Sequence, residues 1–351
     1  MLRFAEQAVT RVGASGQTAR AVALSLVEAD ARNVGTHGVV RLPSYRRQVE
    51  LGEVDPSASP SVIQTKGATA YVDGEQAFGA VTANFSMDLA IERAADLGVG
   101  VAVARRCAHF GAAAHYVRRA ARAGYVAFAA SNTPAVMAPF GGASAAIGNN
   151  PFALGAPHAA GREPLVLDMA QSVVARGRIK LAEMAGETIP DNWAIAPDGL
   201  PTTDPTAALT GALLASGGYK GYGIALLVEI LTSVLSGSRL SPELLNTSMT
   251  GEAIPRPGAV VGNQSQIFIA LDTEAFAGHD VFTAGLGRLA EAMKSVDPAP
   301  GYEEVLMPGE PEERAAADAA VLGIPLADAT VALLSDLAKA LSLEFPAAVE
   351  L

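Results

Sequence analysis

The chain has 351 residues, of which 50% are hydrophobic and 17% are charged, so it can bury a large core and is not an intrinsically disordered protein. Its net charge is −11 and it has no basic run, which excludes nucleic acid and anionic membrane surfaces as expected partners. Cys107 is the only cysteine, which excludes an internal disulfide and favours a reduced, cytoplasmic setting. Residues 1–13 lack an apolar signal core, and the apolar stretch 221–237 is too short to cross a bilayer, so we expect a soluble protein.

The first part of the chain predicts helices that are followed by a cluster of hydrogen-bond donors. Apolar residues recur with helical periodicity up to residue 34. If Thr36 caps a further helix, His37, Arg41 and Tyr45 recur every four residues and lie on one face of it. Such a stripe can hold a carboxylate and polarise a neighbouring oxygen, whereas the alternative is an exposed basic stripe without a ligand. A strand-turn-strand unit, a helix and a strand are then expected at residues 61–73, 79–97 and 99–104.

The stretch 105–157 carries the most informative pattern of the chain. His109-Phe110-Gly111 is predicted to open an alanine-rich helix, and residues 125–131 follow as a buried strand. Polar or glycine-rich breaks come next, where α/β proteins usually place ligand-binding loops, at residues 132–134, 139–142 and 148–151. A titratable histidine beside such loops suits chemistry on a small anion. The alternative is that His109 only caps the start of its helix.

The second half of the chain contains two further candidate ligand contacts. Residues 164–169 predict a short strand that ends in Asp168, and the next helix is expected to begin at residue 170. An acid at the end of such a strand commonly contacts a ribose or takes part in catalysis. The alternative is that Asp168 only caps a helix. Residues 217–223 place glycines around Lys220 ahead of a long apolar helix up to Leu235, which predicts a phosphate-binding turn or, alternatively, a turn without a ligand. The remaining elements are a loop suggestive of a lid or a subunit contact, one strand and three helices, expected at residues 238–264, 266–271, 281–295, 311–322 and 326–342.

Common catalytic and cofactor motifs are absent from the sequence. The dinucleotide fingerprint G-x-G-x-x-G does not occur, and Gly285-Leu-Gly287 lies inside a helical pattern without a preceding strand. Zinc-protease, Walker A and nucleophile-elbow motifs are also missing. The histidines are too scattered for a metal site, so none is predicted, and nothing marks Cys107 as an activated nucleophile.

A set of longer motifs follows in order over nearly the whole chain: ADARNVGTHGVVRLPSYRRQVELG, AHFGAAAHY, PFGG, GNNPFALGAP, VLDMA, DNWAIAPDGLPTTDP and GGYKGYGIALLVEILTSVLSG. Together these motifs resemble the type-2 malate/L-lactate dehydrogenase family, which also contains L-sulfolactate, ureidoglycolate and Δ1-piperideine-2-carboxylate reducing enzymes. The resemblance implies an α/β fold of the malate/L-sulfolactate dehydrogenase type, with a mixed sheet and a non-Rossmann dinucleotide site. It also implies an enzyme that uses NAD or NADP and forms a homodimer.

The resemblance implies roles for individual residues. His109 falls where the family keeps its acid/base, and His37 and Arg41 fall on its substrate-binding H-G-x-x-R motif, so these three form the expected catalytic set. The other matched residues are Thr36, Tyr45 and Thr133 for substrate binding, and Asp168, Met169, Ala170, Lys220, Asn150 and Gly142 for cofactor binding. The sequence departs from the family at Thr36, where serine is usual but the hydroxyl is kept, and in the weakly matching region 238–264, which leaves the substrate open.

The expected organisation has two parts. Residues 1–75 are expected to form a helical, substrate-binding part that packs with residues 275–351, while residues 76–274 form a cofactor-binding α/β part. The predicted reaction moves a hydride between NAD(P) and carbon 2 of a small 2-hydroxy/2-oxo acid, with His109 donating a proton to the carbonyl near neutral pH and Arg41 clamping the carboxylate. Reduction of a cyclic imino acid is the alternative within the family. A non-catalytic carboxylate-binding protein and a metal-dependent lyase are rivals of other classes.

Overall fold

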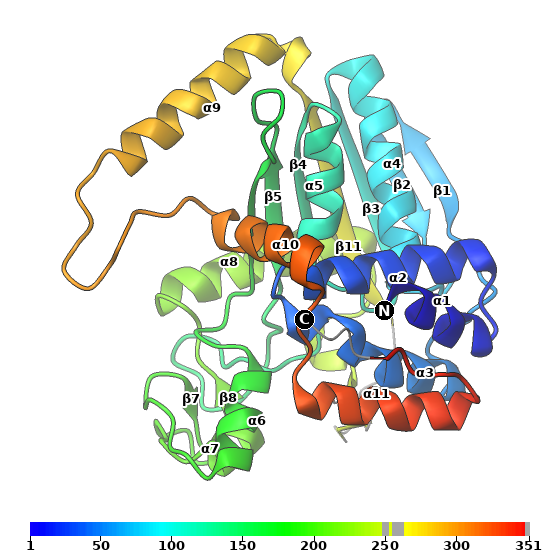
Figure 1. The fold of residues 1–351 in the computed structure, drawn as a ribbon, viewed down its shortest axis with the longest axis vertical. Coiled ribbons are helices and arrows are strands. Elements are labelled where there is room, and N and C mark those ends of the chain that lie inside the picture. Colours follow the sequence, from blue (N-terminus) through cyan, green and yellow to red (C-terminus); the bar gives the residue numbers. More distant parts are fainter. Residues whose placement is uncertain (248–252, 255–262, 348–351) are drawn as a thin grey trace.

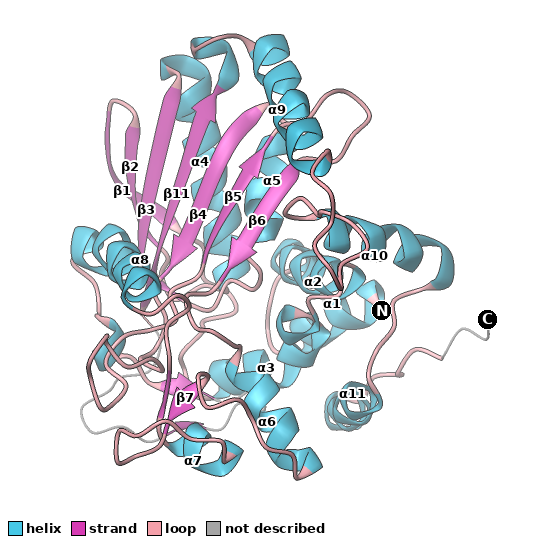
Figure 2. Cartoon of the chain, turned by 90° about the vertical axis from the view of Figure 1, so that its left-hand side faces the viewer, coloured by secondary structure: helices cyan, strands magenta, loops and turns pink. Residues whose placement is uncertain are grey.

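The centre of the molecule is a seven-stranded sheet with the strand order β1-β2-β3-β11-β4-β5-β6 (Figure 2). The computed structural model describes residues 1–247, 253–254 and 263–347. Within the sheet β2 and β3 run parallel, and the other neighbouring pairs are antiparallel, which confirms the predicted mixed α/β sheet. The strands are β1 (Ser61–Lys66), β2 (Thr69–Asp73), β3 (Val99–Cys107), β4 (Tyr125–Ser131), β5 (Phe152–Ala156), β6 (Leu165–Met169) and β11 (Gln264–Asp272).

Strand β3 runs beyond its predicted end at Ala104 because its arginines are neutralised by the neighbouring strand. Arg105 is paired with Asp73 of β2 in the parallel register, and its Nε donates to the Asp73 carboxylate at 3.1 Å. Arg106 donates to the same carboxylate at 3.3 Å. The strand therefore continues to Cys107, and the loop that follows it starts at the end of the central strands.

Two helices, α4 (Gly79–Leu97) and α5 (Ala114–Arg122), cover one face of the sheet (Figure 1). α4 packs against β3 and β11, and α5 packs against β4 and β5. The side chains of Met87, Tyr116 and Phe268 are fully buried between these layers. Burial of such large apolar groups supplies most of the free energy that holds helices on a sheet.

Helix α5 begins at Ala114 and not at the predicted His109. Gly111 adopts a left-handed φ of 81°, a conformation that interrupts a helix. The carbonyl of Phe110 accepts a hydrogen bond from the hydroxyl of Tyr116. His109 therefore lies in a loop between β3 and α5, where its ring faces residues of other elements.

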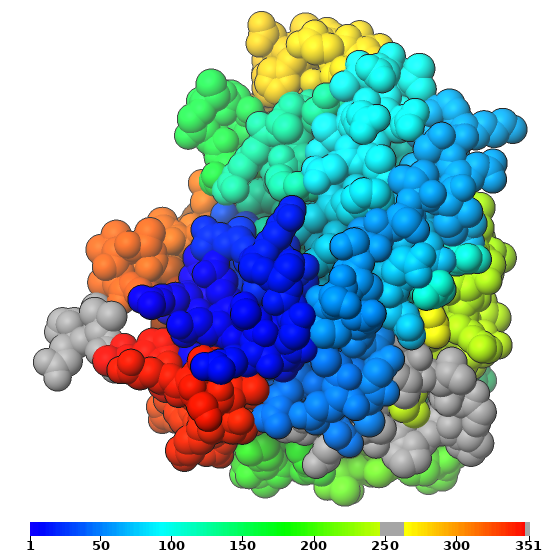
Figure 3. Space-filling view, turned by 90° about the vertical axis from the view of Figure 1, so that its right-hand side faces the viewer, coloured from blue at the N-terminus to red at the C-terminus, as the bar shows by residue number. Residues whose placement is uncertain are grey.

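Helices from both ends of the chain form a second layer, in which the C-terminal helix α11 lies against the N-terminal helices (Figures 1 and 3). Phe4, Leu26, Leu42 and Leu334 are buried in its core. The expected boundary between two parts at residue 75 stays a prediction. Strands β1 and β2, which come before residue 75, belong to the central sheet. The helices of this layer are α1 (Leu2–Arg11), α2 (Gly16–Ala31), α3 (Leu42–Glu50) and α11 (Asp328–Leu341), and α10 (Glu310–Leu322) contacts α2. Helix α9 (His279–Lys294) follows β11 and lies apart from this layer (Figure 1).

A smaller lobe follows β6, and its first helix begins later than predicted. The sequence predicts a helix from residue 170, but α6 begins at Arg176. The intervening residues are extended because Ser172 forms a β-bridge with Ala215 and the N–H of Val173 bonds to the carbonyl of Leu214. The lobe consists of α6 (Arg176–Ala185), β7 (Ala194–Ile195), α7 (Pro205–Thr210) and β8 (Ala212–Leu213).

The apolar helix predicted after residue 217 is confirmed as α8 (Tyr219–Glu229) followed by a π-helical segment (Ile230–Val234). Val228 and Leu231 of this stretch pack against the sheet face opposite α4 and α5. The predicted loop at 238–264 falls partly on residues 248–252 and 255–262, which lie outside the described residues. Among the described residues, no helix has the length and apolar content needed to cross a membrane.

Candidate active site

Two short 3-10 turns, Gly35–His37 and Val39–Arg41, replace the helix that the sequence predicts after residue 35. Gly38 joins the turns in an extended conformation, and a Cβ at this position would lie 1.8 Å from Oδ1 of Asp30. The other oxygen of the Asp30 carboxylate accepts the N–H of Val39 at 2.8 Å. The conformation of the two turns is therefore fixed by Asp30, a buried acid of α2 whose carboxylate packs against Gly38.

The prediction that His37, Arg41 and Tyr45 share one helix face is wrong, because the first two lie in the 3-10 turns and Tyr45 lies in α3. The turns nevertheless keep His37 and Arg41 together. Nε of Arg41 donates to the carbonyl of Thr36 at 2.7 Å, and Oγ1 of Thr36 lies 3.0 Å from Nδ1 of His37. Thr36 therefore orients both neighbours, and the terminal amino groups of the Arg41 guanidinium remain for a ligand.

His109 meets this group of donors from the other side. Nδ1 of His109 lies 3.0 Å from the hydroxyl of Tyr45, and its ring is stacked on that of His37 at a centroid distance of 5.6 Å. The backbone N–H of Gly111 also donates to Nδ1, at 3.4 Å. Because an N–H can only donate, Nδ1 is an acceptor and we assign the proton of the neutral ring to Nε2. Phe78 packs on the Tyr45 ring at 6.1 Å and holds it in place.

Burial and nearby charge keep both imidazoles neutral. Burial lowers the pKa of His109 well below its ordinary value, followed by the positive charge of Arg41 and by the repulsion that a proton on His37 would add. Burial and then Arg41 lower the pKa of His37 to about 3. Burial raises the pKa of Tyr45 to about 12, so its hydroxyl stays protonated and can donate. The lowered pKa favours a neutral His109 ring in the ligand-free protein, in which Arg41 is the cation of the group, while titration near neutrality during turnover stays a prediction.

Asp168 lies in β6, and its carboxylate contacts the start of α5, close to the loop that carries His109. Its Oδ2 accepts the backbone N–H of Ala114 at 2.8 Å. Although the residue is exposed, the protein packed around its carboxyl group raises the pKa of Asp168 to about 6. The acid therefore caps a helix, as one of the two alternatives states, but the helix is α5 and not the one that follows β6. This contact brings the Asp168 segment beside the His109 loop.

Gln171 joins the three segments that carry the predicted cofactor contacts. Its N–H donates to the carbonyl of Asn149 at 2.8 Å, and its own carbonyl accepts the N–H of Ser216 at 2.8 Å. The segments that meet there contain Met169 and Ala170, Asn150, and Lys220. Loops far apart in sequence therefore form one surface.

The glycine-rich turn before α8 has the geometry of an anion-binding turn. Gly217 and Gly218 both have a φ of 64°, and exposed Lys220 lies in the first turn of the helix. A Cβ on Gly221 would lie 2.1 Å from the carbonyl oxygen of Ser216, so this position requires glycine. Backbone N–H groups at a helix start beside a lysine fit the pyrophosphate of a dinucleotide.

Phe140 and Tyr219 are functional candidates that the sequence reasoning missed. Both rings are exposed, by 65% and 62% for the residues, and they meet edge to face at a centroid distance of 6.0 Å. Phe140 also lies 3.6 Å from the Cβ position of Gly218, so the PFGG turn with Gly142 borders the glycine-rich turn. The signal was present, because both glycine-rich motifs contain an aromatic residue beside their glycines. Exposed rings are suited to contacts with a planar ligand.

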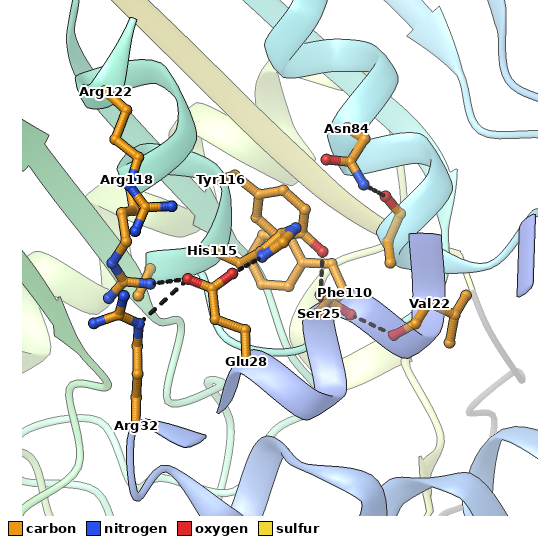
Figure 4. A network of polar contacts seen from close by, with 12 residues as sticks. Val22, Ser25, Glu28, Arg32, Asn84, Phe110, His115, Tyr116, Arg118 and Arg122 are labelled. Carbon is orange, nitrogen blue, oxygen red and sulfur yellow. Dashed lines mark hydrogen bonds and ion pairs between the residues drawn. The ribbon is translucent and has the colours of Figure 1, made fainter. Parts of the chain in front are cut away.

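A partly buried network of ion pairs joins α2 to α5 (Figure 4). The carboxylate of Glu28 in α2 lies 2.5 Å from Nδ1 of His115 and 2.7 Å from Arg118, both in α5, and 3.3 Å from Arg32. Burial raises the pKa of Glu28, but the hydrogen bond with His115 and the charges of His115, Arg118 and Arg32 together lower it to about 2. His115 is therefore a structural residue that joins two layers.

This fold, with its group of donors beside glycine-rich loops, is typical of an α/β oxidoreductase. Residues 1–335 match the malate/L-lactate dehydrogenase family, and the chain belongs to this family. It is 36% identical to L-sulfolactate dehydrogenase of Methanocaldococcus jannaschii over 87% of this chain and 85% of that protein. It is 33% identical to malate dehydrogenase of Pyrococcus horikoshii over 98% of this chain and 94% of that protein.

Solved structures agree with this assignment. The malate dehydrogenase of Entamoeba histolytica superposes with a TM-score of 0.90 at 28% identity, over 98% of this chain and 97% of that one. The chain is thus a dehydrogenase of a family that uses NAD or NADP. The family joins 2-hydroxy acid dehydrogenases with imino acid reductases, since a Δ1-pyrroline-2-carboxylate reductase of Ancylobacter novellus is also a relative. These relatives favour neither of the rival classes, a carboxylate-binding protein or a lyase.

Proposed function

We propose that the protein interconverts a small 2-hydroxy acid of the malate or lactate type and its 2-oxo acid, with NAD or NADP as the hydride carrier. The observation that carries this proposal is the contact of Tyr45 with Nδ1 of His109 beside Arg41. That contact leaves Nε2 of His109 as the nitrogen for proton exchange with substrate. A single cation among neutral donors matches a substrate with one carboxylate next to the reacting carbon.

In this proposal each residue of the donor group has a separate task. The terminal amino groups of Arg41 hold the substrate carboxylate while its Nε stays on the carbonyl of Thr36. In reduction, His109 protonated on both nitrogens gives its Nε2 proton to the substrate oxygen. The remaining Nδ1–H then donates to the Tyr45 hydroxyl, so the ring leaves this step in the other tautomer from that of the ligand-free protein. His37, stacked on His109, lines the same space and orients the reacting oxygen.

Binding of the substrate prepares His109 to act as an acid. The positive charge of Arg41 is one reason for the lowered pKa of His109. A carboxylate bound at Arg41 offsets that charge, so the pKa of His109 rises when substrate binds. The proton is then available where the carbonyl oxygen develops negative charge.

The loop surface is proposed to hold the cofactor. The turn Gly217–Gly218 and Lys220 would bind its pyrophosphate, and the segment Asp168–Ala170 would contact the part nearest His109. A bound nicotinamide supplies or accepts the hydride in this reaction. The PFGG turn, with Gly142, would border the same surface.

The test is a panel of 2-oxo acids and cyclic imines, each run with NADH and NADPH. We expect oxidation of one reduced cofactor with a malate- or lactate-type 2-oxo acid, at a kcat/KM well above that for any cyclic imine. The reverse order would instead identify an imino acid reductase, the alternative that the Ancylobacter novellus relative supports. Absence of turnover with the whole panel would contradict both.

We also propose that the protein is a cytoplasmic homodimer. The helical stretch from α8 onward exposes a row of large apolar side chains, because Leu227, Ile230, Val234 and Leu235 are 53%, 47%, 56% and 61% accessible. A contiguous apolar face of this kind is typical of a subunit interface. Light scattering at micromolar concentration is expected to give twice the mass of one chain, and the mass of one chain would contradict the dimer. Buried Cys107 fits a reducing compartment, which cell fractionation tests.

A further inference from the structure

Asn150 is fully buried, and its side-chain amide is saturated by protein partners. Its Nδ2 donates to Oε2 of Glu229 at 2.7 Å and to the carbonyl of Ala225 at 2.9 Å, and its Oδ1 accepts the N–H of Thr133 at 3.0 Å. Both amide hydrogens are thus used within α8, and the oxygen is used by the loop after β4. The side chain therefore acts within the protein and is not a direct cofactor contact.

Glu229 is a buried acid, and its hydrogen bonds with the described residues include no basic partner. Its Oε1 accepts the N–H of Ser241 at 2.7 Å, and its Oε2 accepts the hydroxyl of Ser241 at 2.6 Å and the amide of Asn150. The residue is 6% exposed, so these donors replace water as its solvation. Since a carboxylate only accepts hydrogen bonds, it forces Nδ2 of Asn150 toward α8 and thereby aims Oδ1 at Thr133.

The backbone around Asn150 is tightly constrained. Asn150 has a positive φ of 27°, an uncommon conformation that its neighbours must hold. A Cβ on Gly148 would lie 2.3 Å from Oδ1 of Asn150 and equally close to the carbonyl of Thr133, so no larger residue fits there. The adjacent Asn149 accepts the hydroxyl of Thr133 at 2.8 Å through its side chain. The two asparagines hold Thr133 from two directions.

We propose that Asn150 and Glu229 are positioning residues, which set the placement of the substrate loop at Thr133 relative to α8 and its cofactor-facing start at Lys220. Glu229 lies at the end of α8 and Lys220 in its first turn, so an anchor at Glu229 fixes the helix along its axis. The same anchor reaches the Asp168 segment, because the carbonyl of Asn149 accepts the N–H of Gln171. The proposal rests on the proposed function for the roles of Thr133 and Lys220.

The central experiment compares Glu229→Gln with Ser241→Ala as its matched control. Glutamine turns one of the two acceptor oxygens into a donor, so the side chain can no longer accept both the amide of Asn150 and the N–H of Ser241. Ser241→Ala removes one hydrogen bond to the same Oε2 but keeps the carboxylate that orients Asn150. We expect Glu229→Gln to lower kcat/KM by roughly 10- to 100-fold, with weaker NAD(P)H binding by calorimetry. Ser241→Ala is expected to lower the melting temperature, since it loses one hydrogen bond. Its kcat/KM and its dissociation constant for NAD(P)H are expected to stay within about twofold of the values of the unmodified enzyme.

Hydrogen–deuterium exchange of the ligand-free proteins provides a readout that does not depend on the proposed function. We expect faster exchange at residues 132–134 and 219–223 in Glu229→Gln but not in Ser241→Ala. The proposal would be overturned if both variants exchanged at the same rate at these residues. It would also be overturned if, in both variants, the loss of NAD(P)H affinity were proportional to the decrease in melting temperature. Lack of turnover in the unmodified enzyme contradicts the proposed function alone.

Asn150→Gly covers the case in which Glu229→Gln does not fold. Glycine tolerates the positive φ at this position, and the change leaves Glu229 on the N–H and hydroxyl of Ser241 while it removes the amide that joins α8 to Thr133. Faster exchange at residues 132–134 together with weaker NAD(P)H binding supports the link. Exchange and binding equal to those of the unmodified protein overturn it.

Discussion

At the scale of single residues, His109 depends on a partner 64 positions earlier in the chain, the hydroxyl of Tyr45. His109→Ala is expected to lower kcat by about 10²–10⁴-fold, the usual range for a positioned acid, with NAD(P)H affinity nearly unchanged. Tyr45→Phe is the milder companion, because it keeps the ring against Phe78 and loses one hydrogen bond, so kcat is expected to fall about tenfold. Stopped-flow measurement of hydride transfer tests both. A folded His109→Ala enzyme with a normal single-turnover rate would refute the mechanism.

The pH dependence of reduction reports the state of His109. Its pKa lies well below the ordinary value in the ligand-free protein, and reduction needs the protonated ring. The value of kcat/KM, which refers to the free enzyme, is therefore expected to rise steadily as the pH falls from 8 to 6, without a plateau. The value of kcat refers to the substrate complex, where the bound carboxylate offsets Arg41, so its plateau is expected at higher pH. One common apparent pKa in both profiles would contradict this coupling.

Arg41 carries the carboxylate contact, and its geometry is as important as its charge. Its Nε is committed to the carbonyl of Thr36 at 2.7 Å, which aims the remaining amino groups. Arg41→Lys retains a positive charge but has one nitrogen, which cannot serve Thr36 and a carboxylate in the same way. We expect a loss of about 2–3 kcal/mol in kcat/KM, mostly through the KM for substrate, with cofactor affinity preserved. Kinetics equal to those of the unmodified enzyme would place Arg41 outside the site.

At the scale of elements, the start of α8 tests the glycine-rich turn. A Cβ on Gly221 would meet the carbonyl of Ser216 at 2.1 Å, whereas nothing lies within 4 Å of the same position on Gly223. Gly221→Ala is therefore expected to distort the turn and to weaken NAD(P)H binding roughly tenfold or more. Gly223→Ala is the matched control, for which we expect unchanged affinity and a gain of up to about 1 kcal/mol in stability. Equal affinity in both variants, measured by calorimetry, would show that this turn does not contact the cofactor.

Elements with strong periodicity could be predicted from the sequence, whereas three helix starts could not. The strand at 125–131 and the helix at 79–97 were predicted correctly because their apolar patterns dominate. The starts expected at Thr36, His109 and residue 170 were wrong because each depends on a contact or a backbone conformation that apolar periodicity does not encode. Asp30 shapes the first region, the left-handed Gly111 the second, and pairing with residues 214–215 the third.

The candidate site was predicted in its composition but not in its contacts. Spacing picked out His37, Arg41 and Tyr45 as donors, yet the helix face that was meant to unite them does not exist. They converge because β3 and α3 bring His109 and Tyr45 together, a contact that local pattern cannot show. Asn150 was assigned to the cofactor because a sequence motif does not reveal that a side chain is buried.

At the scale of the whole molecule, Glu28 joins the helical layer from the chain ends to the helix that covers the sheet. Its carboxylate contacts His115 and Arg118 of α5, and these partners hold its pKa at about 2. A glutamate whose folded-state pKa is lowered stabilises the protein above its unfolded value, about 4.3, and loses that contribution as the pH falls through 2. A shift of this size corresponds to about 3 kcal/mol of stability at neutral pH.

Glu28→Gln is therefore expected to lower the free energy of unfolding by about 3 kcal/mol at pH 7 and by progressively less as the pH falls toward 2. Denaturant titrations of both proteins at several pH values measure this difference. Among the described residues, Glu28 pairs with Arg32, His115 and Arg118 and with none of the residues of the candidate active site. The kcat at pH 7 is therefore expected to change little at temperatures where the variant is folded. A difference in stability that does not vary with pH would mean that Glu28 contributes packing and not charge, and the two layers would then be joined mainly by their apolar contacts.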